Sequence, residues 1–165
     1  MKIMRRVLLT AVIVLSLAST VGAAVIDRVV AFVGDEAITL SELQESYMMT
    51  ASMRPDASRS EVLNTMINRA LMLREARKLR MEAESEDAVI NEYIDLKVRA
   101  FIRISDADME NFYNENKSEF KGAKLTEVRE QIETLLREKE VNSALRKHIE
   151  ALRAGAYIKI VYLPE

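Results

Sequence analysis

The sequence predicts a mainly helical fold in which a small β-sheet joins an N-terminal hairpin to the C-terminal strand. Apolar residues recur at helical spacing through most of the chain between positions 39 and 153. Residues that favour strands, β-branched and aromatic, gather at 29–33 and 156–163. A lone hairpin of this size is marginal in water and needs a third strand or a helix against it. We therefore expect the two ends to pair and to enclose the helices.

The hairpin is expected to form the start of the fold. Residues 29–33 give its first strand, Gly34 and Asp35 fit a two-residue turn, and 37–38 return as the second strand. The closing strand should lie beside this hairpin and bury one of its faces. The residues expected to face the helices from that strand are Ile158, Ile160 and Tyr162.

The first 23 residues have the pattern of a secretory signal peptide. Lys2, Arg5 and Arg6 form a positive start, an apolar run follows over 7–18, and small residues close the segment at 21–23. An uncleaved membrane anchor is the alternative, but a helix needs about 20 apolar residues to span a bilayer. The pattern predicts export, with no stable membrane insertion once the segment is removed.

Cleavage after Ala23 would leave 142 of the 165 residues, a length that suits one domain. We expect that domain to span 24–165, with an N-terminal part at 24–120 and a closing helix and strand at 125–165. Its formal charge would move from −2 to −5, because the removed segment holds three basic residues and no acidic ones. Such a chain is not an obvious nucleic-acid binder, and without cysteine it has no disulfide framework or thiol chemistry.

Four of the five expected helices begin at a residue that can cap a helix N-terminus. Thr39 and Ser58 each precede a glutamate by three residues, the spacing of a capping box, and Ser85 and Ser105 precede acidic first turns. The expected helices span 39–52, 58–80, 85–101, 105–113 and 126–153. The last would be about 42 Å long, at about 1.5 Å per residue. That exceeds the diameter of a compact body of this size, so part of this helix should project or bend.

No residue pattern predicts an enzymatic site, a cofactor or a metal. His148 is the sole histidine of the sequence, and a lone helical histidine is most often a surface or half-buried residue. No nucleophile-elbow pattern accompanies it, which leaves a hydrolase as a weak third interpretation. The four glycines form no phosphate-binding loop, and the acidic residues at 82–87 lack the spacing of a calcium loop.

Methionine and aromatic residues beside the expected helix breaks are the candidate binding residues. Methionine is flexible and polarizable and recurs on surfaces that bind unlike partners. Met66 lies in an apolar row and is interpreted as core, whereas for the methionines before the first break binding and packing both stay open. We expect the helices to pack around a groove instead of a closed core. The candidate peptide-binding residues are Met48, Met49, Met53, Met109, Phe112 and Tyr113.

Several segments resemble SurA-type periplasmic chaperones. VIDRVVAFVGDEAITLSEL at 25–43 is similar to the start of those proteins, and 60–80 resembles the helix that follows there. ISDADMENFYNENKSEF at 104–120 looks like the segment that ends at the entrance to their parvulin prolyl-isomerase domain, and 125–163 resembles their closing helix and strand. The isomerase domain itself is missing, because only 121–124 separates these two segments.

The resemblance implies a helical, SurA N-terminal or trigger-factor-like peptide-binding domain in the periplasm. Its expected function is ATP-independent binding of unfolded or outer-membrane-bound polypeptides, including outer-membrane protein precursors. No isomerase activity is expected, since parvulin sites use paired histidines and this chain has one. The alternative is a non-catalytic interaction subunit that binds one dedicated envelope partner. The two functions share a fold, so the sequence leaves both open, as it does a possible homodimer.

Overall fold

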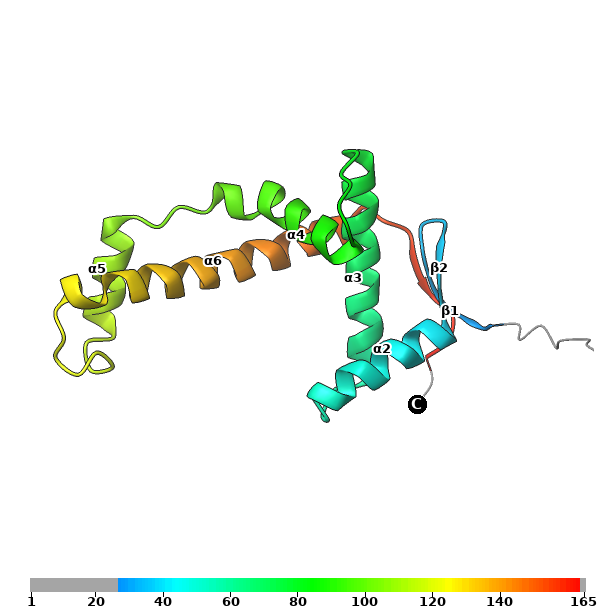
Figure 1. Ribbon diagram of the computed structural model, residues 1–165, viewed down its shortest axis with the longest axis horizontal. Helices are drawn as coiled ribbons and strands as arrows, with labels where there is room; N and C mark the ends of the chain where they lie inside the picture. The colour runs from blue at the N-terminus through cyan, green and yellow to red at the C-terminus, as the bar shows by residue number, and fades with distance from the viewer. Residues whose placement is uncertain (1–26, 164–165) are drawn as a thin grey trace, which may run out of the picture.

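The computed structural model describes residues 27–163, which form a hooked arrangement of helices attached to a small sheet (Figure 1). The fold is mainly helical with one three-stranded antiparallel sheet, so the predicted fold class is confirmed. In chain order the elements are strands β1 (Val29–Val33) and β2 (Glu36–Thr39), helices α2 (Leu40–Met53), α3 (Arg59–Lys78) and α4 (Glu86–Lys97), the 3₁₀ turn η1 (Arg99–Phe101), helices α5 (Asp106–Glu115) and α6 (Leu125–Ala154), and strand β3 (Ile158–Ile160).

The two ends of the described chain meet in the sheet, as predicted. The strand order is β2-β1-β3, and β1 pairs antiparallel with both neighbours. Gly34 makes the hairpin turn with a φ of 65°, and its N–H donates to the carbonyl oxygen of Tyr157 at 2.8 Å. A Cβ at position 34 would also lie 2.9 Å from a terminal nitrogen of Arg74. Glycine is therefore required here by conformation and by space.

Helix α3 lies at the centre of the packing and contacts the hairpin, α2, α4 and α6. Its first half joins the sheet and α2 in one buried cluster, and its second half joins α4 and the end of α6 in another. The first cluster comprises Val30, Ala31, Val33, Ile38, Leu43, Val62, Leu63, Ile67, Ala70 and Leu71. The second comprises Met72, Leu73, Ala76, Ile90, Tyr93, Ile94 and Val98.

Helix α6 forms an arm that extends away from the sheet and carries α5 near its far end (Figure 1). It has 30 residues, which correspond to about 45 Å at about 1.5 Å per residue. Its C-terminal part packs on α3, and Ile132 is its one buried residue. The prediction that this helix projects from a compact body is confirmed.

Two expectations about buried faces are wrong. The helix after Ser85 ends at Lys97 instead of continuing, and Phe101 is 75% exposed. Val98 leaves the helical conformation, with φ −125° and ψ −65°, and the chain then runs along α6 to α5 (Figure 1). In β3, Ile158 packs on the first cluster, but Ile160 and Tyr162 are 50% and 38% exposed. Because β3 lies at an edge of the sheet and pairs over three residues, only its start is covered by the helices.

The predicted helix starts are confirmed in detail. Thr39 and Ser58 form capping boxes with Glu42 and Glu61, and Ser105 forms one with Asp108. Each pairs a side-chain oxygen with an amide that the helix leaves without an intrahelical partner. The caps fix where α2, α3 and α5 begin.

Removal of the Ser105 hydroxyl is expected to raise the pKa of Asp108. The Ser105 side chain and then its backbone N–H hydrogen-bond the carboxylate and hold the pKa of Asp108 below its ordinary 3.8. Because the folded value is the lower one, the interaction stabilises α5 above pH 3.8 and is lost as pH falls through the folded pKa. In Ser105→Ala, a carbon-detected NMR titration should show this pKa moving upward; an unchanged value would mean that the hydroxyl contributes nothing.

Candidate functional site

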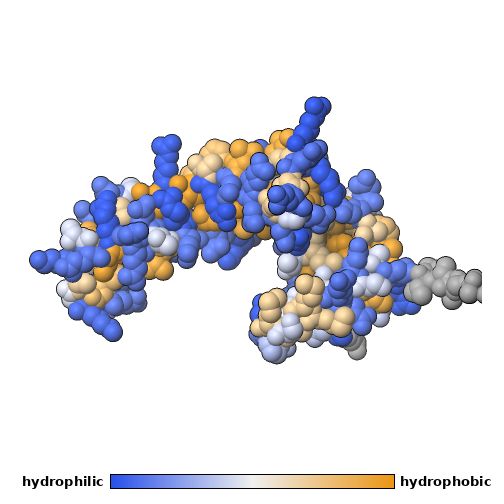
Figure 2. Space-filling model, viewed as in Figure 1, coloured by the Kyte–Doolittle hydropathy of each residue, from blue (hydrophilic) through white to orange (hydrophobic). Residues whose placement is uncertain are grey.

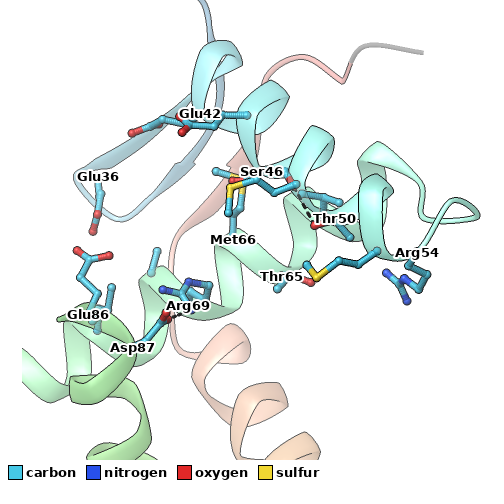
Figure 3. Close-up of a pocket in the computed structure, with 16 residues that line it drawn as sticks. Glu36, Glu42, Ser46, Thr50, Arg54, Thr65, Met66, Arg69, Glu86 and Asp87 are labelled. Carbon is cyan, nitrogen blue, oxygen red and sulfur yellow. Dashed lines mark hydrogen bonds and ion pairs between the residues drawn. The ribbon is translucent and has the colours of Figure 1, made fainter.

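An open groove of about 740 Å³ runs between α2 and α3 in the described part of the chain. We call it the α2–α3 groove. Its walls are a face of α2, a face of α3, one residue of β2 and the first turn of α4 (Figure 3). The lining residues are Glu36, Glu42, Glu45, Ser46, Met49, Thr50, Met53, Arg54, Val62, Thr65, Met66, Arg69, Ala70, Leu73, Glu86 and Asp87.

The spacing of residues along α2 separates a packed face from a groove face. Leu40, Leu43 and Tyr47 lie three and four residues apart and pack in the first cluster. The guanidinium of Arg59 also stacks on the Tyr47 ring, 4.5 Å from its centroid. The face that lines the groove follows the same helical period, from Glu42 through the methionines to the end of the helix. α2 is therefore anchored on one side and open on the other.

Three candidate methionines lie exposed on α2. Met48, Met49 and Met53 are 59%, 62% and 81% exposed, and the last two line the groove. Met48 lies outside the groove on the same helix. The exposed end of α2 carries a patch of apolar surface in Figure 2, where the molecule is open beneath the α6 arm. Met66, expected in the core, is half-buried against the first cluster and also lines the groove.

The two ends of the groove differ in charge. Glu36, Glu42, Glu86 and Asp87 gather at the end nearest the sheet and α4, whereas Arg54 lies at the opposite end (Figure 3). The acidic end is only partly neutralised. Arg69 pairs with Asp87 at 2.5 Å, while the single guanidinium of Arg77 lies 3.4 Å from Glu36 and 3.9 Å from Glu86.

A second groove of about 520 Å³ lies at the other end of the molecule, between α5, α6 and the segment that follows α4. We call it the α5–α6 groove. It holds the candidate residue Phe112, which is half-buried, and the exposed Phe101. Its lining residues are Phe101, Ile102, Arg103, Ile104, Asp108, Asn111, Phe112, Glu115, Leu136, Lys139 and Glu140.

Two candidate residues make packing contacts. Met109 is 3% exposed, because it is the buried residue with which α5 packs on α6. Tyr113 stacks on Phe120 with centroids 5.6 Å apart, and its hydroxyl donates to the carbonyl oxygen of Ala123 at 2.7 Å. These two contacts hold the loop before α6 against α5. Burial therefore contradicts the assignment of Met109 as a peptide-binding residue, whereas the assignment of Tyr113, which is half-buried, stays a prediction.

The predicted groove among the helices from Thr39 and Ser60, the Phe112 helix and the long helix is divided between the two grooves described above. α2 and α3 line one groove, α5 and α6 line the other, and no residue lines both. Sequence reasoning further missed Phe101 and the acidic end of the α2–α3 groove. Phe101 follows the apolar row of α4 by the expected spacing, so its exposure depends on where the chain turns. The acidic end joins residues from β2, α2 and α4, which local patterns do not bring together.

His148 takes part in a packing contact. It is half-buried, and its Nε2 lies 2.8 Å from the hydroxyl of Tyr93, which links α6 to α4. Burial, together with the charge of Glu75, raises the pKa of Tyr93. Among residues 27–163, no group of three histidine, cysteine or acidic side chains is placed to hold a metal ion.

No protein-family model matches the chain, and no curated sequence matches it. Over 27–163, the helices are all too short or too polar to cross a bilayer. The function proposed below therefore rests on the geometry and charge of the two grooves.

Proposed function

We propose that this chain is an ATP-independent chaperone that holds unfolded or outer-membrane-bound polypeptides in the α2–α3 groove. The observation that carries the proposal is the position of Met49 and Met53, which are 62% and 81% exposed on the wall of an open groove. Apolar side chains gathered on an exposed surface are typical of a binding site. Methionine suits many sequences, because its unbranched side chain re-packs against unlike partners.

The apolar floor of the groove supports the same function. Val62, Met66 and Leu73 come from α3 and line the groove, so a bound segment would contact apolar side chains from two helices. Burial of apolar surface stabilises a complex by about 25 cal/mol per Å², and ordering a flexible client offsets part of that gain. We expect a Kd in the micromolar range, which corresponds to a binding free energy of about −8 kcal/mol. Binding of that strength releases the client without nucleotide.

The α5–α6 groove, which holds Phe101, Phe112 and Leu136 among polar and charged residues, supplies a second surface for the same client. The α6 residues that line it, at 136–140, lie near the middle of this 30-residue helix. The part of α6 from there to its C-terminal end is about 24 Å long and would be matched by about seven residues of extended chain at about 3.3 Å each. A client that occupies one groove would meet the other at a raised effective concentration. Long unfolded chains should therefore bind more tightly than short peptides.

The proposed place of action is the periplasm. It rests on the signal-peptide pattern of the first 23 residues, which lie outside the described residues. No prolyl-isomerase activity is part of the proposal, since His148 bonds to Tyr93 and does not line either groove.

A dedicated interaction subunit is the second candidate, and one observation favours it. Strand β3 lies at an edge of the sheet, and Ile160 and Val161 beside that edge are 50% and 53% exposed. A folded partner could add a strand there. Crosslinking in the native compartment separates the two functions: many unfolded clients support the chaperone, and one stoichiometric partner supports the subunit.

Replacing Met48, Met49 and Met53 together by serine is expected to weaken chaperone activity while the fold is kept. Each side chain is more than half exposed, so each substitution should change the free energy of unfolding by less than about 0.5 kcal/mol. Because serine offers much less apolar surface to a client than methionine does, the Kd should rise at least about tenfold. The measurement is suppression of aggregation of an unfolded outer-membrane protein, without nucleotide, at several chaperone concentrations.

The matched control replaces three exposed leucines outside both grooves by serine. These are Leu79, Leu96 and Leu135, which are 45%, 50% and 44% exposed. The control should protect the client as well as the parent protein does. Equal loss in both variants would mean that general surface hydrophobicity protects the client, and full activity in the methionine variant would exclude the α2–α3 groove.

A further inference from the structure

We infer that the α2–α3 groove selects apolar segments that carry lysine or arginine on one flank. This inference rests on the proposed function, because it concerns which polypeptides the same groove takes. It follows from the charge difference between the ends of the groove. An apolar wall fixes no sequence, whereas a charged end favours clients with the opposite charge beside their apolar residues.

The length of the groove sets the length of the selected segment. Its α2 wall runs from Glu42 to Met53, which corresponds to about 17 Å along the helix axis. About five residues of extended chain cover that distance at about 3.3 Å each. The apolar side chains of such a segment would lie against Met49 and Met53, and the flank beyond them would reach the acidic end.

The charges of the acidic end are only partly neutralised within the protein, although Glu42 accepts hydrogen bonds from Thr39. Five carboxylates line the groove, the four of the acidic end and that of Glu45, and the guanidinium groups paired with them are those of Arg69 and Arg77, which leaves a formal charge of −3. Arg77 is shared between two of the carboxylates. Glu45 makes no hydrogen bond or ion pair with any other described residue. The five carboxylates are those of Glu36, Glu42, Glu45, Glu86 and Asp87.

The opposite end makes the selection one-sided. Arg54 lines that end and lies 3.4 Å from Glu61, in a pair whose side chains are 57% and 59% exposed. Because this pair is formally neutral, the end offers no excess negative charge to a second basic flank. The groove therefore favours a segment with its positive charge on one side of the apolar residues.

Three peptides test the inference on the unsubstituted protein. Each spans five residues, three identical apolar residues followed by a two-residue flank of Lys-Lys, Gln-Gln or Glu-Glu; binding is measured by fluorescence anisotropy with an uncharged label. We expect the Lys-Lys peptide to bind about three- to tenfold more tightly than the Gln-Gln peptide, and the Glu-Glu peptide to bind more weakly by a similar factor. Salt at about 0.3 M should reduce these ratios to less than about twofold.

Two double variants locate the effect. Glu36→Gln with Glu45→Gln should lower the preference for Lys-Lys over Gln-Gln about threefold. The control is Glu110→Gln with Glu150→Gln, which removes the same charge from exposed positions outside both grooves. It should leave the preference for Lys-Lys over Gln-Gln unchanged. An equal effect of both variants would assign the preference to net charge and overturn the inference.

The peptide series separates failure of this inference from failure of the proposed function. If all three peptides bind with the same Kd, the groove binds polypeptides without charge selection, and only the inference is overturned. If none of the peptides binds and no unfolded protein binds either, the proposed function is overturned as well.

Discussion

Leu71→Ala is expected to lower the free energy of unfolding by about 2–5 kcal/mol, the range for leucine truncation in a packed core. Leu71 is fully buried in the cluster that joins the sheet, α2 and α3. Removing its branched end deletes apolar contacts and leaves a cavity that rigid neighbours fill only in part. Since α3 contacts the hairpin, α2, α4 and α6, the lost packing should destabilise the whole fold. Urea denaturation followed by circular dichroism measures the change.

The same substitution at an exposed leucine is the control. Leu96 lies on α4 and is 50% exposed, so Leu96→Ala should cost less than about 0.5 kcal/mol. If both variants unfold at the same urea concentration, the position of Leu71 in the core is wrong, and α3 is not the centre of the fold.

Deletion of residues 157–165 is expected to lower the free energy of unfolding by several kcal/mol. The deletion removes β3 and with it the pairing of β1 on one side. It also removes the contact of Ile158 with the first cluster and the hydrogen bonds of the Gly34 and Val161 amides. Burial of an isoleucine contributes about 1.5–3 kcal/mol, and each hydrogen bond adds about 0.5–1.5 kcal/mol. The melting temperature of the truncated protein should fall accordingly.

A point substitution within β3 controls for surface effects. Lys159 is exposed and its backbone pairs with Phe32, so Lys159→Ala keeps the main-chain pairing and should leave the melting temperature nearly unchanged. An unchanged melting temperature after the deletion itself would mean that the pairing of the two ends contributes no stability.

The local features of the fold could be predicted from the sequence because short-range chemistry decides them. Thr39, Ser58 and Ser105 cap their helices through residues three positions away, so the helix starts follow from four consecutive residues. The turn at Gly34 likewise depends on the conformation of a single residue. The pairing of the ends followed from the need of a lone hairpin for a third strand.

The candidate site was predictable only in part, because exposure depends on packing between distant elements. Met53 and Met109 both lie near an expected break, yet one is 81% exposed and the other 3% exposed. The difference arises because α5 packs on α6 through Met109, whereas α2 turns the side of Met53 to solvent. The acidic end of the α2–α3 groove depends on Glu36 and Glu86, which are 50 positions apart in the sequence.

The most direct test of the proposed binding site is methionine-methyl NMR on the full chain as an unfolded outer-membrane protein segment is titrated into it. We expect the ¹³C-methyl signals of Met49, Met53 and Met66, which line the α2–α3 groove, to shift or broaden together. The signal of Met72, buried in the second cluster, should stay unchanged. Saturating binding without any change in the signals of Met49 and Met53 would contradict the α2–α3 groove as the binding site.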